Sequence, residues 1–465
     1  MEKRVKDIDR GKRGFGLRDS ISYAIGDIGC SFSFALKNLL AIFWTQYMGL
    51  DLWYSALLIV IQIADAVADP LIGAFIDGDR RTYRRNKFLT YMSIGSLGLA
   101  VGGAISFIPV PNAPLIVKMI IFVAGYVIWN AFYTLVNVPY GSLLPLISSD
   151  PADRASLSAW RSVGAVIGNM LPTLILPFII YDDKNDLIGQ RLFFAAIVMG
   201  LLGFFSLQYM TRSTVLRVQT NVVTEPKPKK GLFSSMKSFF RNRPAVGVTI
   251  AAMGMFLAVN GGAAAVTVLF QSYFDNVAAS GIVQVAAMLP VLFITPFVRR
   301  VVKYGKKEIA VIGALISAAA YALMLILPIT PDSKGMIFYV ICQLIGNLGT
   351  GLFGAVSWAL MADSIDYGEW KTGKREEGII FSLHSFFRKL AQGIGPAIVL
   401  VVMKILGYVG ENGGAQTDAV AFRMRYLVAA LYLVGAFLQI FGLAFVYNLG
   451  KKTLSRMNEA KNTKT

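Results

Sequence analysis

The feature that most constrains this chain is a series of long segments without a charged residue. A helix that crosses the hydrocarbon core of a bilayer needs about 20 predominantly apolar residues. Charge-free runs of that length lie at 88–117, 119–149, 162–181, 192–211, 245–274, 276–298, 309–331, 335–362 and 426–450. Three more apolar segments carry isolated charges, at 21–50, 53–77 and 378–408. The sequence therefore predicts an all-α membrane protein with twelve transmembrane helices.

Composition excludes several other classes of protein. Charged residues make up 15% of the 465 residues, against about 25% in soluble domains. This excludes a disordered chain, a coiled coil and an ordinary cytosolic enzyme. The two cysteines, Cys30 and Cys342, exclude a disulfide scaffold and do not stand at a zinc-type spacing. The first apolar segment is too long for a cleaved signal peptide, and Asp27 interrupts it.

The basic residues indicate the topology of the membrane segments. They gather in the first 18 residues, at 80–87, 212–243 and 299–307, and after 450, whereas the alternate connections hold few. Cytoplasmic loops carry the excess of Lys and Arg in membrane proteins. We therefore expect a multi-pass protein of the cell (inner) membrane with both termini in the cytoplasm. The net charge of +18 is then a topology signal, and we expect no nucleic-acid partner.

A charged, proline-rich segment divides the chain. The run EPKPKK at 225–230 is typical of a linker that does not fold alone, and six predicted helices lie on each side of it. We expect an N-terminal bundle at 1–211, a cytoplasmic loop at 212–244, a C-terminal bundle at 245–450 and a basic tail at 451–465. This is the plan of the major facilitator superfamily, whose substrates bind near the middle of the membrane.

Ionisable side chains inside the predicted helices mark candidate sites, because each costs a few kcal/mol in a bilayer. Asp65 and Asp69 stand one turn apart on one helix face, and two carboxylates this close need a compensating charge. We predict that they bind the coupling cation, Na⁺ or H⁺; a salt bridge to a neighbouring helix is the alternative. Asp27 fits a capping or packing role as well as a functional one. Lys37 needs an acidic partner, either Asp65 or the substrate.

Basic, amide and aromatic side chains in other helices are candidates for substrate recognition. These candidates are Arg161, Asn137, Tyr133, Lys389, Arg388 and Lys37. Arg388 and Lys389 are neighbours and point about 100° apart, so we expect only one of them to face the substrate. His384, the sole histidine, precedes Arg388 by one turn. Its role is open between a proton carrier and a hydrogen-bonded packing residue.

Several segments together resemble the glycoside–pentoside–hexuronide:cation symporter family, a branch of the major facilitator superfamily. They are YAIGDIG at 23–29, DAVADP at 65–70, the basic loop 77–87, NVPY at 137–140, SAWR at 158–161 and DYGEWKTG at 366–373. The resemblance covers nearly the whole chain, and DYGEW is its most specific part. Segments 241–244 and 382–389 are most similar to glucuronide carriers. The resemblance implies symport of a glycoside, most of all a hexuronide, with a cation and without a cofactor.

Residue by residue, the resemblance implies two sites. The cation positions are Asp65, Asp69, Thr134 and Ser31. The sugar positions are Arg161, Lys389, Tyr133 and Asn137. Three of this chain's residues depart from the family: Ser31 and Asn137 each stand where the related melibiose permeases have an aspartate, and Gln62 replaces a common arginine. Asn137 removes a repulsion against an anionic substrate, and Lys37 lies at a similar depth to Gln62, where it can restore the missing positive charge.

The connections after the fourth and tenth predicted helices occupy equivalent places in the two halves, and each mixes acids with bases. We expect ion pairs there that close the cytoplasmic side and break during turnover. The candidate gate residues are Asp150, Arg154, Asp363, Asp366, Glu369 and Arg375.

The favoured function is therefore a cation-coupled glycoside symporter that works as a monomeric unit, with a small-molecule glycoside and membrane lipid as its partners. Within transport, the alternative is a carrier of pentosides, xylosides or other oligosaccharides. A membrane-embedded enzyme is disfavoured because the sequence lacks a His/Cys/Asp ligand cluster at metal spacing and a G-x-S-x-G motif. A channel is disfavoured because a selectivity ring needs repeated charges or carbonyls from an oligomer.

Overall fold

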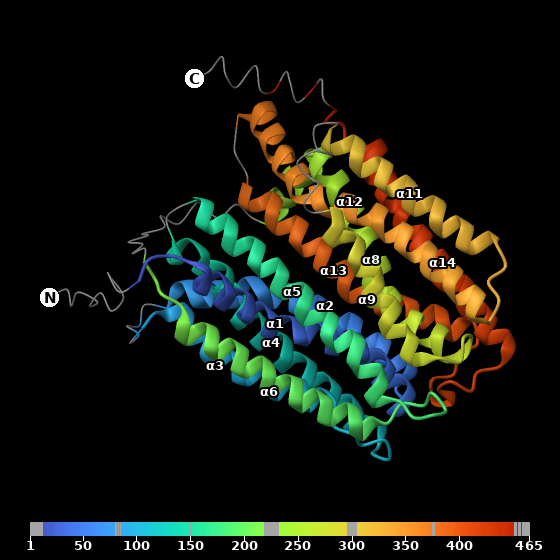
Figure 1. The fold of residues 1–465 in the computed structure, drawn as a ribbon. Coiled ribbons are helices and arrows are strands. Elements are labelled where there is room, and N and C mark those ends of the chain that lie inside the picture. The colour runs from blue at the N-terminus through green and yellow to red at the C-terminus, as the bar shows by residue number, and fades with distance from the viewer. Residues whose placement is uncertain are drawn as a thin grey trace. The chain divides into compact units, whose positions relative to one another are not determined.

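The computed structural model describes residues 13–79, 81, 83, 85–148, 151–217, 232–294, 305–373, 377–450, 453 and 457. Nearly all of these residues are helical or lie in short connections between helices (Figure 1). The chain forms two compact units, Met1–Glu225 and Pro226–Thr465. The boundary between them falls within the segment 212–244, for which a loop is predicted.

The first unit contains the helices of the N-terminal half. They are α1 (Leu17–Ile42) with its π-helical continuation η1 (Phe43–Tyr47), α2 (Asp51–Gly78), α3 (Lys87–Ser106), α4 (Leu115–Ile147), α5 (Pro151–Ile180) and α6 (Gly189–Ser213). The second unit contains α7 (Leu232–Arg241), α8 (Arg243–Ser272), α9 (Val277–Ile294), α11 (Lys306–Ile326), α12 (Ser333–Thr372), α13 (Glu377–Ile405), η4 (Gly410–Asn412), α14 (Asp418–Ile440) and η5 (Phe441–Val446).

The helices confirm the predicted all-α membrane fold. In the described residues, ten helices are long and apolar enough to cross a membrane. Shorter apolar stretches, Leu52–Asp65 and Val277–Pro290, lie in α2 and α9. These twelve helices follow the order of the twelve predicted segments.

Three boundaries differ from the charge-free runs. Helix α3 ends at Ser106 rather than near 117, because the prolines that follow lack the N–H that would continue the helix. Helix α12 continues past Asp363 to Thr372, and Gly373 ends it with a left-handed φ of 67°. The predicted loop 212–244 contains α7. Phe239 of α7 is buried and lies 6.0 Å, between ring centres, from Phe387, so tertiary burial stabilises this short helix.

The two units share one packing pattern. In each unit the first membrane helix packs on the fifth and the sixth, the third on the fourth and the sixth, and the second on the fourth. These pairs are α1–α5, α1–α6, α3–α4, α3–α6 and α2–α4 in the first unit, and α8–α13, α8–α14, α11–α12, α11–α14 and α9–α12 in the second. The second half of the chain therefore repeats the architecture of the first, as transporters built from internal repeats do.

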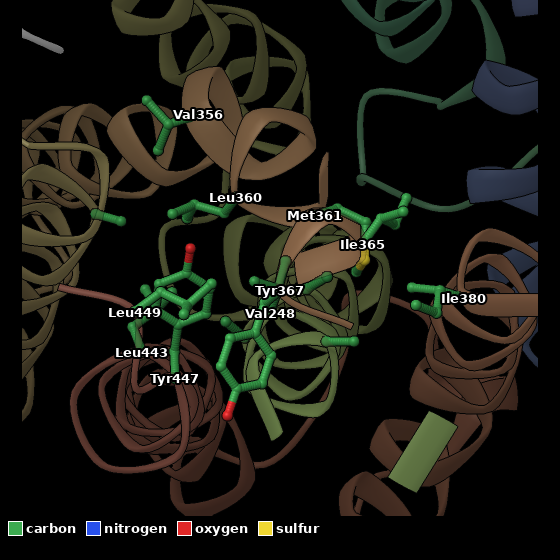
Figure 2. Packing of buried hydrophobic residues seen from close by; sticks show 14 of the residues in the cluster. Val248, Val356, Leu360, Met361, Ile365, Tyr367, Ile380, Leu443, Tyr447 and Leu449 are labelled. Carbon is green, nitrogen blue, oxygen red and sulfur yellow. The ribbon is translucent and has the colours of Figure 1, made fainter. Parts of the chain in front are cut away.

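An apolar cluster in the second unit supports the extended end of α12 (Figure 2). Its labelled members are Val248, Val356, Leu360, Met361, Ile365, Tyr367, Ile380, Leu443, Tyr447 and Leu449. Because α12 alternates these buried side chains with acids, its packing holds Asp363, Asp366 and Glu369 on a rigid helix rather than on a loop.

Helices α1 and α5 approach closely at glycine residues. A Cβ added at Gly164 would lie 2.2 Å from the carbonyl oxygen of Ala24, and one added at Gly168 would lie 2.8 Å from that of Ile28. We expect Gly164→Ala to push the helices apart and to cost about 1–3 kcal/mol, the usual range for overpacking. Thermal unfolding of the purified protein measures the loss. Gly141→Ala is the matched control, because nothing lies within 4 Å of its added Cβ. Equal melting temperatures for both variants would contradict this prediction.

Candidate functional site

Side chains from two helices of the first unit, α1 and α4, contact Arg161 of α5. Its Nε donates to Asp27 Oδ1 of α1 at 3.0 Å, and a terminal nitrogen donates to Asn137 Oδ1 of α4 at 3.1 Å. The guanidinium carbon lies 4.6 Å from the ring centre of Tyr140. The structure therefore unites Arg161 and Asn137, two predicted substrate residues, with Asp27. Sequence reasoning did not select Asp27 for the site.

Two stacked tyrosines lie beside this group. The rings of Tyr23 and Tyr140 stack with their centres 4.5 Å apart. Each hydroxyl donates to the other residue's backbone carbonyl oxygen, at 2.9 Å from Tyr23 and 2.5 Å from Tyr140. The side chain of Asp27 is 8% exposed, but that of Arg161 is 34% exposed. The Arg161 side chain is thus bonded to its neighbours and still partly exposed.

Lys37 lies against an aromatic stripe of α4. Its Nζ is 5.4, 5.5 and 5.3 Å from the ring centres of Tyr126, Trp129 and Tyr133, and it donates to Asn130 Oδ1. The four α4 residues stand at positions i, i+3, i+4 and i+7, which share one helix face. Aromatic faces stabilise a cation. Only Tyr133 was predicted for the site; the spacing of the stripe is the sequence signal that identifies the other three.

Tyr126 connects Lys37 with the acidic helix α2. Gln62 Nε2, on the helix that carries Asp65, donates to the Tyr126 hydroxyl at 2.5 Å. Lys37 and Gln62 therefore contact the same tyrosine, and Gln62 stands three residues before Asp65 on α2. The side chain of Asp69 is outside the described residues. Cation binding by the two aspartates stays a prediction.

The remaining cation candidates are buried. Ser31 follows Asp27 by one turn on α1, and Thr134 lies on α4; both side chains are buried. Among the residues that the structure describes, no group of three His, Cys, Asp or Glu side chains could hold a metal ion.

In the second unit, His384 and Arg388 contact aromatic residues. His384 is buried, with Nδ1 2.9 Å from Thr249 Oγ1 and its ring 5.7 Å from the Trp358 ring. These contacts support the packing interpretation of His384. The guanidinium carbon of Arg388 lies 5.3 Å from the ring centre of Phe256 and 5.4 Å from that of Trp358. Lys389, its neighbour on α13, is partly buried.

Arg161 and Arg388 occupy matching places in the repeated units. Each lies on the fifth membrane helix of its unit, and each faces an aromatic ring of the fourth. Tyr140 stands 25 residues after Leu115, the first residue of α4, and Trp358 stands 25 residues after Ser333, the first residue of α12. The first helix differs between the units, because α1 supplies Asp27 whereas α8 contains no acidic residue.

The predicted gate is only partly within the described residues. Asp150 and Arg375 lie outside them, as does the side chain of Arg154. Asp363 accepts two hydrogen bonds from Lys306 Nζ at 2.7 Å, which joins α12 to α11 inside the second unit. The remaining two candidates lie on α12, at 366 and 369. Closure of the cytoplasmic side by these residues stays a prediction.

Hydrogen bonds order the basic connection between α2 and α3. Asp79 accepts from the hydroxyls of Tyr83 and Tyr91 and from the backbone N–H of Arg81, and these bonds lower the pKa of Asp79 to about 2. Arg85 donates to carbonyl oxygens near the end of α6. The connection is thereby attached to two helices of the first unit.

Comparison with known proteins agrees with this architecture. The family model described as MFS/sugar transport protein matches residues 22–451. An uncharacterized symporter, YjmB of Bacillus subtilis (strain 168), is 30% identical over 97% of this chain and 96% of its own length. The isoprimeverose transporter of Lactiplantibacillus pentosus is 29% identical over 88% and 84%. The glucuronide carrier protein homolog of Escherichia coli (strain K12) is 27% identical over 94% and 93%.

The family match covers most of the chain, and the described residues form twelve apolar helices in two repeated units, as in a multi-pass transporter. The chain therefore belongs to the MFS/sugar transport protein family of the major facilitator superfamily, and it is a membrane transporter and not an enzyme.

Proposed function

We propose that this transporter is a cation-coupled symporter of an anionic glycoside, with a glucuronide or another hexuronide as substrate. The observation that carries the proposal is the partly exposed side chain of Arg161 inside the first unit, in contact with Asn137 and Tyr140. A carboxylate that enters a low-dielectric site needs a cation to meet it. The amide of Asn137 suits the hydroxyls of a sugar, whereas the buried ring of Tyr140 packs against the guanidinium.

Asp65 and Asp69 supply the coupling in this proposal. A cation, Na⁺ or H⁺, neutralises the pair in the membrane, and its gradient drives accumulation of the sugar by alternating access. The transporter works as a monomeric unit in the cell membrane, with both termini in the cytoplasm. The charge distribution of the connections supports this orientation.

A pentoside or xyloside is the alternative substrate. The isoprimeverose and glucuronide relatives are similar to this chain to nearly the same degree, so identity does not choose between the two substrate classes. A neutral glycoside has no negative charge that the basic site residues could bind. We therefore favour the hexuronide.

Uptake into proteoliposomes tests the proposal. Labelled aryl glucuronides, galactosides and xylosides are offered under an imposed sodium gradient and, separately, under a proton gradient. We expect accumulation of the glucuronide with one of the two gradients. Accumulation of the xyloside alone would establish the alternative. Dissipation of the gradient without accumulation would indicate a channel, and a chemically altered solute would indicate an enzyme.

Lys37→Gln is expected to weaken the coupled uptake of p-nitrophenyl β-glucuronide and of p-nitrophenyl β-glucoside to the same extent. The reason is that Asn130 and three aromatic rings hold Lys37, and one of these rings, that of Tyr126, is bonded to Gln62 on α2, the helix that carries Asp65. Lys37→Arg, which keeps the charge, is the control. A several-fold larger loss of affinity for the glucuronide would instead show that Lys37 reads the carboxylate, since a charge-assisted bond contributes about 1.5–3 kcal/mol. The affinities of Lys389→Gln for both substrates are measured in the same way, and a larger loss for the glucuronide would show that Lys389 binds the carboxylate.

A further inference from the structure

The ion pair between Asp27 and Arg161 needs a reason beyond helix packing. Ionisable side chains in membrane helices are costly, and a buried ion pair is weak evidence for stability. The Asp27 side chain is almost entirely buried. It lies ten residues after the first residue of α1, and the nearest polar side chains along this helix carry no charge. A pair of apolar residues would join α1 and α5 at a lower desolvation cost.

The second unit shows that this packing does not require a carboxylate. Its first and fifth membrane helices, α8 and α13, pack in the same way, and α13 also carries an arginine at the matching place. Phe256 of α8 contacts Arg388, and the α8 sequence has no acid. Asp27 is therefore a specific addition to the first unit.

The geometry of the pair leaves room for a stronger anion. Only one oxygen of Asp27 accepts a hydrogen bond from Arg161, and the donor is the Nε–H, at 3.0 Å. A guanidinium has five N–H donors and binds a carboxylate best through two parallel bonds. A carboxylate that reaches the partly exposed side chain of Arg161 can form such a fork, whereas Asp27 is fixed on α1.

We propose that Asp27 occupies Arg161 as an internal substitute for the anionic group of the substrate, and that an anionic glycoside displaces it. This inference rests on the proposed function and extends it. The displaced carboxylate stays inside the membrane, so a cation carried with the substrate compensates it. Binding of the substrate's charge and binding of one additional cation are then linked at Arg161. A neutral glycoside leaves Asp27 in place and takes up no such cation.

Linkage gives the proposal a measurable consequence. If the cation raises the affinity for the anionic substrate, the substrate raises the affinity for the cation by the same factor. Purified wild-type protein in lipid nanodiscs is titrated with p-nitrophenyl β-glucuronide and with the matched β-glucoside, which lacks the carboxylate. Bound protons are counted by calorimetry in buffers of different ionisation enthalpy, and bound sodium with a radioactive tracer. We expect one more cation bound with the glucuronide than with the glucoside.

Asp27→Asn removes the internal competitor. We expect it to raise the affinity for the glucuronide about tenfold, the effect of losing one charge-assisted bond near the lower end of its range, and to abolish the additional cation. Affinity for the glucoside should not change. Asp19→Asn is the matched control: it breaks a buried pair on the same helix, with Arg13 and Arg217, and should leave the ratio of the two affinities unchanged.

The outcomes separate this inference from the proposed function. Equal cation uptake with both probes would overturn the inference alone, and this measurement needs no variant, so it stands even where Asp27→Asn does not fold. A loss of affinity for both probes in Asp27→Asn would assign a merely structural role to the pair. Binding of neither probe would overturn the proposed substrate class and the inference together.

Discussion

Asp65→Asn and Asp69→Asn are each expected to abolish gradient-driven accumulation of the neutral p-nitrophenyl β-glucoside, so that its uptake stops at equal concentrations inside and outside. An asparagine cannot neutralise a cation in the membrane, and the cation gradient then no longer drives the sugar. Exchange of labelled for unlabelled sugar without a gradient should survive, because Arg161 and Asn137 form a separate group on α5 and α4. Proteoliposome uptake and counterflow measure the two activities separately.

Asp51→Asn is a suitable control for this experiment. Asp51 is the first residue of α2, at the end of the same helix rather than within it, and its replacement should leave accumulation intact. Normal accumulation in both the Asp65 and the Asp69 variants would show that the coupling cation binds elsewhere.

Arg161→Gln is expected to lower the free energy of unfolding by about 3 kcal/mol and to abolish transport. Removal of one partner from a buried ion pair costs about 3–5 kcal/mol because the other charge is left uncompensated, and the partial exposure of Arg161 places the cost at the lower end. The double variant Asp27→Asn/Arg161→Gln should recover most of this stability, since neither charge remains. It should not recover transport, because the guanidinium is still missing.

A double-mutant cycle measures this coupling. Denaturant or thermal unfolding of the wild type, the two single variants and the double variant gives the interaction energy, which is expected to be at least 1 kcal/mol for residues in direct contact. Additive losses in the cycle would contradict the description of Asp27 and Arg161 as an energetically coupled pair.

Sequence patterns identified the membrane helices but not all of their ends. The prolines after Ser106 and the glycine at 373 are local signals that explain where α3 and α12 stop. Helix α7 is different, because its ten residues are stabilised by packing of Phe239 against Phe387 of α13. A short helix of this kind depends on a surface that the local sequence does not contain.

The candidate site shows the same division. Asp65, Arg161 and Asn137 stand out in the sequence because charged and amide groups are rare in membrane helices. Asp27 stands out for the same reason, but from the sequence a capping or packing role fits it equally well. Its contact with Arg161 is a property of helix packing.

The sequence by itself determined which segments cross the membrane and how they divide into two halves. Hydrocarbon offers no hydrogen bonds, so each crossing segment must form a helix from its own residues, and the charges between segments set the limits. Only the tertiary structure decided which buried charges meet. Asp27 and Arg161 lie 134 residues apart in the chain, and they pair because glycines on α5 let its backbone approach that of α1. Close approach of two helices depends on the shapes of both surfaces together, and neither helix encodes it alone.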